Sequence, residues 1–533
     1  MKKRIMATAM ACSILATCGM TACGGDGGQF ENSETNAIVA MYYGGYGTTA
    51  MEKVAAAFNA EPENVEKGYT VAISDQGGGF IASGATSKLE TGKDNFDLML
   101  TATISVYNIV DEGADYLAGY DCALEDLTQD VYELNVPGEN VKFKDKMLKQ
   151  FYDYNTFKGK QHSMTWASGP SGIAYRADFF KANGWTIPRT TNEMIELAQT
   201  IVNAGYTPYI WSTDGSYWYY SVLAWWRQLI DDQEFDDFWN GLDKNGELSA
   251  EAFKTNARLQ AFQELEKILA GPQGAYRTDG HLHEKSGTLS ANETQLALYD
   301  TNNKICMMAN SDWLENEMKQ SEVQPGEVDI GLFKTPIISG ILKKFDETTK
   351  KEVDRFETVK TEEQLRAVIS SIDEGKTSHD GVSAADFAAL KKIRSYTGTE
   401  AQNHTAIVPA YANAKGVAKE FLRYLATDKA MQIYYNETGT FLPFDNKGVT
   451  VDTSTTFRQD VYKMSQGAHY VSNFDSKNPL FYKTKLDFFM NTKIEQMIAT
   501  TSAIDQKTGS EYWTYVYDEA EKEWSTALAQ SKS

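Results

Sequence analysis

Short, unbroken apolar runs alternate with amphipathic segments along the first hundred residues. Residues 37–43 and 96–100 are almost wholly apolar, which is the pattern of strands buried on both faces. Residues 69–74 form a third strand-like run, and between the first and third runs the apolar positions of residues 51–58 recur at helical spacing. Strands that alternate with helices in this way predict a parallel sheet and an α/β fold.

A further buried run, at residues 305–309, leads into a predicted helix. The run stops at Asn310 and Ser311, and the pattern predicts Asp312 as the N-cap, with Glu315 three residues later completing a capping box. Trp313 is therefore expected at the junction between the end of a strand and the start of a helix. That edge of an open α/β sheet is where ligands bind.

The length of the chain and the positions of its turn residues predict more than one lobe. A chain of 533 residues is too long for one hydrophobic core. Turn residues interrupt strand-like sequence at residues 163–175, which predicts a segment crossing between lobes. Residues 331–336 predict a second crossing. Residues 343–403 are rich in charged helix formers and are interpreted as a helical insertion.

The N-terminus has the pattern of an export signal. A basic start is followed by an apolar run at residues 5–17 that is too short to span a bilayer, so residues 1–22 are predicted to be a signal peptide. Residues 20–23, Met-Thr-Ala-Cys, resemble a bacterial lipobox with Cys23 as the lipidated residue. Cleavage before Cys18 is the competing interpretation, but it leaves the bulkier Thr17 before the cut. Residues 23–36 are then the lipidated cysteine and a flexible tether.

Charge and cysteine content narrow the function classes. The formal net charge of −22 argues against nucleic acid as a partner. After cleavage, Cys122 and Cys306 remain beside Cys23, and one disulfide between them is arithmetically possible. Because Cys306 lies in a buried apolar strand, two packed thiols are the favoured prediction.

One motif resembles a nucleotide-binding turn. Residues 45–50 fit G-x-G-x-x-A between a strand and a helix, and Asp75 ends the next strand, as in a dinucleotide site. The export signal and the bulky Tyr46 within the turn argue against it, and any tight turn favours glycine. His281 and His283 have no evident third ligand. We therefore expect no cofactor and no metal.

Aromatic residues are the remaining candidate chemistry. Trp and Tyr side chains near loops or element ends present flat apolar faces with polar edges, which suit the C–H faces and hydroxyl rims of sugars. Core packing is the competing interpretation. It is favoured for Trp225 and Trp226, which lie in helical context, whereas ligand binding is favoured for Trp211, Trp218 and Trp313.

Four stretches resemble extracellular solute-binding proteins of sugar-type ABC importers, which are lipoproteins in Gram-positive bacteria. Residues 168–178 are similar to the first inter-lobe crossing, and residues 188–193 to the family's Pro-x-Thr-Trp-x-Glu helix start, although the Trp is absent. Residues 307–313 are similar to the turn whose Trp stacks on sugar, and residues 414–428 to the helix of the returning N-lobe segment. The stretches occur in the family's order behind a lipobox.

The resemblance implies a two-lobed fold of the maltose-binding-protein type (type II), with hinge-crossing segments and a cleft. It implies an N-lobe of residues 37–165 and 337–430 and a C-lobe of residues 166–336 and 431–533, with the insertion at 343–403 in the N-lobe. Such a protein is no enzyme: it captures a carbohydrate, expected to be an oligosaccharide, closes on it and docks on membrane permease subunits. We expect a monomer, anchored by Cys23 to the outer face of the cell membrane.

The cleft is expected to carry ligand-binding residues on both walls. The predicted residues are Tyr43, Tyr46, Asp75, Thr101 and Thr103 on the N-lobe side and Trp166, Trp211, Tyr217, Trp218, Asp312 and Trp313 on the C-lobe side.

The principal alternative is a surface-anchored carbohydrate-active enzyme. It would share the signal and the aromatic residues, but it needs two carboxylates held roughly 5–10 Å apart across the sugar. Asp75 and Asp312 are the candidates for that pair if they meet in a closed cleft. An adhesin or scaffold is a third class, which would neither bind nor turn over a soluble saccharide.

Overall fold

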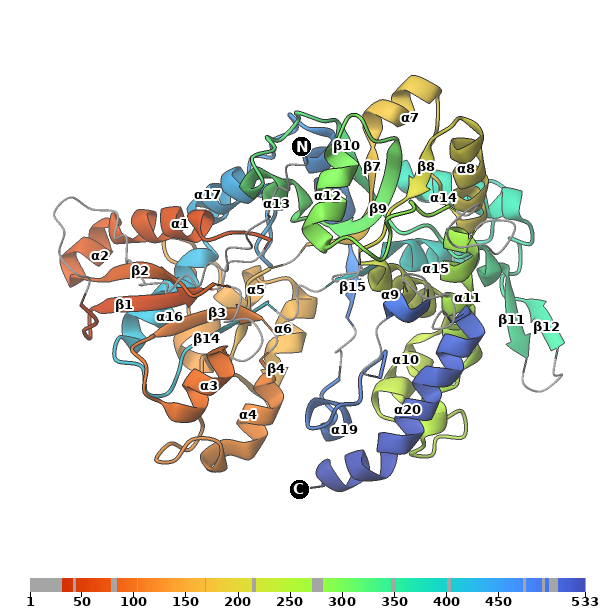
Figure 1. Cartoon of the computed structure of the whole chain (residues 1–533). Helices are drawn as coiled ribbons and strands as arrows, with labels where there is room; N and C mark the ends of the chain where they lie inside the picture. The colour runs from red at the N-terminus through yellow and green to blue at the C-terminus, as the bar shows by residue number, and fades with distance from the viewer. Residues whose placement is uncertain are drawn as a thin grey trace, which may run out of the picture.

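The structure is a computed structural model that describes residues 31–41, 45–77, 84–102, 104–167, 169–212, 217–270, 281–346, 351–399, 404–472, 476–490, 494–497 and 507–532. The predicted lipidation site Cys23 and the ligand candidates Tyr43 and Thr103 lie outside these residues. Figure 1 shows the chain folded into two α/β lobes, with the N-terminal third in one lobe and most of the middle of the chain in the other.

The N-lobe is built on a five-stranded sheet in the order β2-β1-β3-β14-β6. β1 (Asn36–Met41), β2 (Thr70–Asp75) and β3 (Leu98–Ala102) pair in parallel, as the alternating pattern predicts. β14 (His404–Ile407) runs antiparallel to β3 and to β6 (Met164–Thr165). The side chains of residues 37–41 are buried because helices cover both faces of the sheet.

The other N-lobe elements surround this sheet. They are α1 (Thr49–Asn59), α2 (Pro62–Lys67), α3 (Gly84–Thr91), α4 (Val106–Glu112), α5 (Phe143–Lys146), α6 (Lys149–Asn155), β4 (Thr156–Phe157), β5 (Lys160–Gln161), α16 (Lys415–Leu425) and α17 (Asp428–Thr438).

The C-lobe is built on a four-stranded sheet in the order β10-β7-β9-β8. β9 (Ile305–Ser311) is buried along its whole length, which confirms the strand predicted there, although it continues through Asn310 and Ser311. It pairs antiparallel with β7 (Ser171–Arg176) and parallel with β8 (Thr207–Tyr209), and β7 also pairs antiparallel with β10 (Ile330–Phe333).

The remaining C-lobe elements are mostly helices. They are α7 (Ala177–Asn183), α8 (Thr191–Asn203), α9 (Trp218–Leu229), α10 (Asp232–Trp239), α11 (Asn256–Ala270), α12 (Ala291–Tyr299), α13 (Leu314–Gln320), β11 (Lys343–Asp346), β12 (Lys351–Asp354), α14 (Glu362–Asp373), α15 (Ala384–Ser395), β13 (Tyr396–Gly398), α18 (Thr456–Ser465), β15 (His469–Val471), α19 (Pro479–Tyr482) and α20 (Gly509–Gln530).

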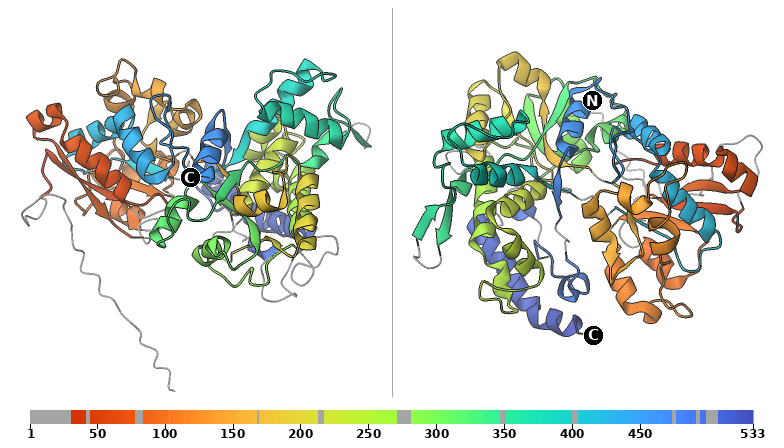
Figure 2. Two further views of the ribbon diagram at one scale, coloured as in Figure 1. Left: turned by 90° about the horizontal axis from the view of Figure 1, so that it is seen from above. Right: turned by 180° about the vertical axis from the view of Figure 1, so that it is seen from behind.

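The hinge lies where the two sheets approach each other. The chain passes from the N-lobe to the C-lobe between β6 and β7, within the crossing predicted from the turn residues. β13 and β15 pair in parallel there, and the Thr397 and Thr399 hydroxyls donate to the backbone oxygens of Ser171 and Gly169 at 2.8 Å. Both views in Figure 2 show the two lobes on either side of the molecule.

The helical insertion packs on the C-lobe, whereas the sequence assigned it to the N-lobe. Apolar side chains of α14 and α15, including Val368 and Leu390, share one core with Trp225 and Leu265. The predicted crossing at residues 331–336 is also wrong, since β10 belongs to the C-lobe sheet and the chain returns only between Thr399 and β14. The predicted boundary at residue 431 is wrong as well. Residues 431–449, assigned to the C-lobe from the sequence, contribute to the N-lobe core, and the chain re-enters the C-lobe before α18.

Two local predictions have opposite outcomes. The capping box at Asp312 is wrong, because α13 begins one residue later with Trp313 as an uncapped N-cap. The two packed thiols are confirmed: Cys306 is buried, Cys122 is half-buried, and both are free. In the described part of the chain, no helix has the length and apolarity required to cross a membrane.

Candidate functional site

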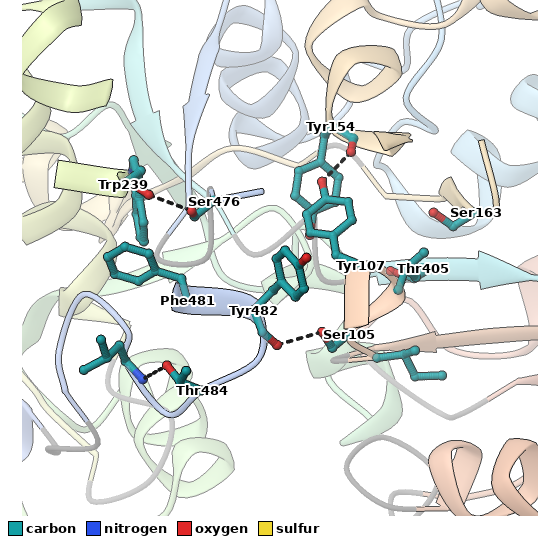
Figure 3. Close-up of a pocket in the computed structure, with 13 residues that line it drawn as sticks. Ser105, Tyr107, Tyr154, Ser163, Trp239, Thr405, Ser476, Phe481, Tyr482 and Thr484 are labelled. Atoms are coloured by element: carbon teal, nitrogen blue, oxygen red, sulfur yellow. Dashed lines mark hydrogen bonds between the residues drawn. The ribbon is translucent and has the colours of Figure 1, made fainter. Parts of the chain in front are cut away.

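A cavity of about 230 Å³ lies between the two lobes. We call it the cleft cavity, and Figure 3 shows side chains from both lobes converging on it. The residues that line it are Ile104, Ser105, Val106, Tyr107, Tyr154, Ser163 and Thr405 from the N-lobe and Trp239, Ser476, Phe481, Tyr482, Thr484 and Leu486 from the C-lobe.

The N-lobe wall is formed by the start of α4 and the end of α6. α4 begins just beyond the carboxyl end of β3, which brings Tyr107 to the edge of the sheet. The Tyr107 hydroxyl donates to the backbone oxygen of Tyr154, and its ring stacks on Phe157 with centroids 4.8 Å apart. These two contacts fix the Tyr107 ring in the wall.

The C-lobe wall combines the end of α10 with a segment near the C-terminus. A capping box at Asp231 starts α10, which ends at Trp239. Ser476 donates to the backbone oxygen of Trp239 at 2.8 Å, and the Phe481 ring lies edge-on to the Trp239 ring at 5.2 Å. We call residues 476–486 the strap. Figure 1 shows its helix α19 between the lobes.

The strap points neighbouring aromatic rings in opposite directions. The Asn478 side chain caps α19 and Pro479 is its first residue, so the strap turns sharply at this point. Phe481 is buried in the C-lobe core, whereas the half-buried Tyr482 lies edge-on to Tyr107 at 5.9 Å in the N-lobe. The strap therefore belongs to the C-lobe and touches the N-lobe.

The lining of the cleft cavity combines aromatic rings with hydroxyls. Rings come from Tyr107, Tyr154, Trp239, Phe481 and Tyr482, and the lining serine and threonine hydroxyls lie among them. Among the described residues that line it, none is Asp, Glu, Lys, Arg or His. This arrangement can bind a neutral molecule with flat apolar faces and many hydroxyls.

Charged groups lie at the rim of the cleft cavity, behind Tyr482. Asp111 of α4 pairs with Lys158 of its own lobe and with Lys483 of the strap, the latter at 2.6 Å. Hydrogen bonds from Lys158 and Lys483 lower the pKa of Asp111 to about 2. Burial, with Asp111 nearby, raises the pKa of Tyr482 to about 12. Asp111 is thus charged and Tyr482 neutral at physiological pH.

Tyr46, Asp312 and Trp313 meet at a different place. The Tyr46 hydroxyl donates to Asp312 Oδ1 at 3.2 Å, and the Asn316 side chain donates to the backbone oxygen of Gly45 at 2.6 Å. A Cβ atom on Gly45 would lie 2.7 Å from the Trp313 side chain. We call this the hinge-side contact (Gly45 and Tyr46 against Asp312, Trp313 and Asn316). Trp313 fills the space above the glycine turn that a pyrophosphate would need.

Burial dominates the chemistry of Asp312. It is 1% exposed, and burial raises its pKa to about 7 against the hydrogen bonds from Ser311 and Tyr46. A Cβ atom on Gly169 would lie 1.8 Å from Asp312 Oδ1, so the carboxyl packs directly on the first crossing segment. Asp312 therefore links both lobes and the hinge rather than capping α13.

The other predicted ligand residues mostly pack in cores. The Trp166 indole donates to the Thr101 backbone oxygen at 3.3 Å in the N-lobe, where both residues are buried. Trp211 and Trp218 stack on each other in the C-lobe, with centroids 6.3 Å apart.

Tyr217 and Asp75 lie in different surroundings. The half-buried Tyr217 lies edge-on to Trp313 at 5.5 Å, whereas Asp75 is exposed at the end of β2, where it accepts from the Gly77 backbone. Like the other predicted residues that the structure describes, neither lines the cleft cavity. Trp225 and Trp226 are core residues, as predicted.

Sequence reasoning missed the rings that line the cleft cavity. Tyr107 and Trp239 lie at helix ends, and Phe481 and Tyr482 lie in a helix of one turn, so none of them belongs to a long periodic pattern. The one usable signal was the aromatic pair that follows Asn478 and Pro479, since an Asn-Pro start marks a turn that can present side chains.

Comparisons with known proteins agree with this architecture. The family model for bacterial extracellular solute-binding proteins matches residues 43–336. A search of curated proteins found no match.

In the part of the chain that the structure describes, no cluster of His, Cys, Asp or Glu side chains that could hold a metal ion was found.

Solved structures match over nearly the whole chain. RafE, known from Streptococcus pneumoniae, in complex with raffinose is 13% identical over 91% of this chain and 99% of RafE, with a TM-score of 0.55. The Thermus thermophilus maltotriose-binding protein bound with maltotriose is 13% identical over 92% and 100%, with a TM-score of 0.54. The substrate-binding protein Lmo0181 of Listeria monocytogenes with cycloalternan is 12% identical over 92% and 99%, with a TM-score of 0.56.

These likenesses confirm the two-lobed fold, and the family model covers more than half of the chain. The resemblance based on the four sequence stretches is confirmed. The chain belongs to the family of bacterial extracellular solute-binding proteins.

Proposed function

We propose that this protein captures a neutral carbohydrate in the cleft cavity and delivers it to the permease of an ABC importer. The observation that carries the proposal is the lining of the cleft cavity. Aromatic rings and hydroxyls from both lobes form it, and none of the described residues that line it has a charged side chain. Rings suit the apolar faces of a sugar, and hydroxyls suit its rim. The neighbours named above were solved with raffinose, maltotriose and cycloalternan, which supports the same ligand class.

The proposal includes an extracytoplasmic location and no chemistry. A family of extracellular binding proteins acts outside the cytoplasm. We propose that Cys23 carries a lipid that anchors the protein to the outer face of the membrane, and that the protein works as a monomer. A glycosidase would need two carboxylates facing its substrate, whereas Asp312 is buried and Asp75 is exposed away from the cleft cavity.

Calorimetry against a panel of neutral and charged saccharides tests the proposal. We expect saturable binding of a neutral saccharide in the micromolar range, which corresponds to about −8 kcal/mol, without product formation. Tyr482→Ala should weaken it about tenfold, because one ring contact contributes roughly 1 kcal/mol or more. Tyr120→Ala, which removes an exposed ring outside the cleft cavity, is the matched control and should bind normally.

Two results would contradict the proposal. Turnover of a saccharide would establish an enzyme. Binding of charged but not neutral saccharides would show that the uncharged lining does not select the ligand.

A further inference from the structure

We propose that Asp111 and Lys483 form a latch across the mouth of the cleft cavity and act as positioning residues for ligand retention. Neither residue lines the cavity; they would act through Tyr482, which does. The inference rests on the proposed function, since it assumes that the cleft cavity holds the ligand.

The strap is anchored firmly on its C-lobe side. Leu480 and Leu486 are 2% exposed, and the Phe481 ring packs edge-on against Trp239 and tilted against Phe238. A segment held by three buried apolar side chains moves with the lobe that buries them. Any contact that the strap makes with the N-lobe is therefore a contact between lobes.

On its N-lobe side the strap uses polar contacts. The Ser105 hydroxyl donates to the Tyr482 backbone oxygen at 3.2 Å, and Lys477 donates to the Asp153 backbone oxygen. Lys483 Nζ lies 2.6 Å from Asp111 Oδ2, with both side chains mostly shielded at 14% and 17% exposure. A shielded ion pair is screened less by solvent than an exposed one, so it can contribute measurably.

Asp111 also acts on the position of Tyr482, through Lys483. Lys483, the strap partner of Asp111, directly follows Tyr482 in the chain, and the nearby Asp111 charge contributes to the raised pKa of Tyr482. The same Tyr482 ring contacts Tyr107 and Phe157 edge-on at 5.9 and 5.6 Å. Asp111 thus holds the strap through Lys483, and the strap carries the Tyr482 ring that lines the cavity, so a ligand can leave more easily when this ion pair opens.

The chain supplies a matched control for the latch. Lys158 also pairs with Asp111, but it belongs to the N-lobe and is 58% exposed. Lys158→Met and Lys483→Met each leave Asp111 with one cation, so neither creates a buried unpaired charge. Only Lys483→Met removes an ion pair between the lobes.

The test measures binding of the neutral saccharide identified by calorimetry, using stopped-flow fluorescence and two salt concentrations. Lys483→Met should weaken affinity about three- to tenfold, mainly through faster dissociation, whereas Lys158→Met should stay within twofold of the wild type. Asp111→Asn should reproduce the Lys483→Met effect. Wild-type affinity should fall about twofold or more between roughly 20 mM and 500 mM salt, and Lys483→Met should lose this dependence.

The salt dependence separates a latch from a merely structural role. A neutral ligand in an uncharged cavity has no ionic contact for salt to screen, so any salt effect reports charges elsewhere. Wild-type affinity that is independent of salt, together with unchanged dissociation in Lys483→Met and Asp111→Asn, would overturn the latch while leaving the proposed function intact. If no neutral saccharide binds the wild type, the proposed function fails and the role of the latch fails with it.

Discussion

The hinge-side contact and the strap join the same two lobes with different chemistry. At the hinge side, Trp313 is 5% exposed and packs on Gly45, and the neighbouring polar contact joins the Tyr46 hydroxyl to the buried Asp312 carboxyl. At the strap, Lys483 and Asp111 form an ion pair at the rim, beside the half-buried Tyr482. Separating the first exposes apolar surface, whereas separating the second exchanges polar contacts for water.

This difference divides the work between the two contacts. A buried apolar contact contributes several kcal/mol to stability, roughly, whereas a single ion pair at the rim contributes about 1 kcal/mol and opens more readily. We therefore expect the hinge-side contact to determine how stably the lobes are joined, and the strap to determine how long a ligand stays.

The largest expected effect is the loss of the Trp313 indole. Trp313→Ala should lower the free energy of unfolding by about 3–5 kcal/mol, because it leaves a cavity among Gly45, Tyr46, Tyr217 and Tyr220. Urea unfolding followed by circular dichroism measures it. Tyr482→Ala in the strap is the comparison and should cost about 1 kcal/mol or less. Equal losses in the two variants would contradict the division between the contacts.

A smaller effect is expected from adding one methyl group at the hinge side. In Gly45→Ala the new Cβ atom would lie 2.7 Å from Trp313, so the lobes must shift there, at a cost of about 1–3 kcal/mol in unfolding free energy. Gly416→Ala in α16 is the matched control. Its nearest neighbour would be the Tyr69 hydroxyl at 3.7 Å, and alanine suits a helix. If both variants unfold like the wild type, the close approach of Trp313 to Gly45 is not needed.

Much of the fold could be predicted because local patterns specify elements and their order. The strand runs at residues 37–43 and 305–309 correspond to β1 and β9, and the alternation with helices specified parallel pairing in the N-lobe. The insertion shows the limit. An apolar stripe such as that of α14 indicates that a helix packs on a core, but not on which lobe.

The site was harder to predict because it depends on contacts between distant parts of the chain. Trp313 was correctly placed between a strand and a helix, but the opposing lobe covers its ring. Conversely, Tyr107, Trp239 and Tyr482 come from three separate segments and meet only because the crossings bring the lobes together. A single sequence carries the local turn but not the partner that faces it.

The smallest expected effect shows whether the buried Asp312 carboxyl at the hinge side is protonated or ionised in the folded protein. Burial raises the pKa of Asp312 to about 7, against an ordinary value of 3.8. Between about pH 4 and 7 the folded protein retains this proton while the unfolded chain releases it. The contribution of the proton to stability is therefore complete below about pH 4, decreases as pH rises, and is fully lost once pH has risen through about 7. From pH 5 to pH 6 the wild type should lose about 1 kcal/mol of unfolding free energy relative to Asp312→Asn, because one pKa unit corresponds to about 1.4 kcal/mol.

Urea unfolding of both proteins at the two pH values measures the difference, and Asp75→Asn, which removes an exposed carboxyl, is the control that should run parallel to the wild type. A gap between wild type and Asp312→Asn that does not change with pH would mean that Asp312 is ionised in the folded protein, and the hinge-side contact would then hold a charge as the strap does.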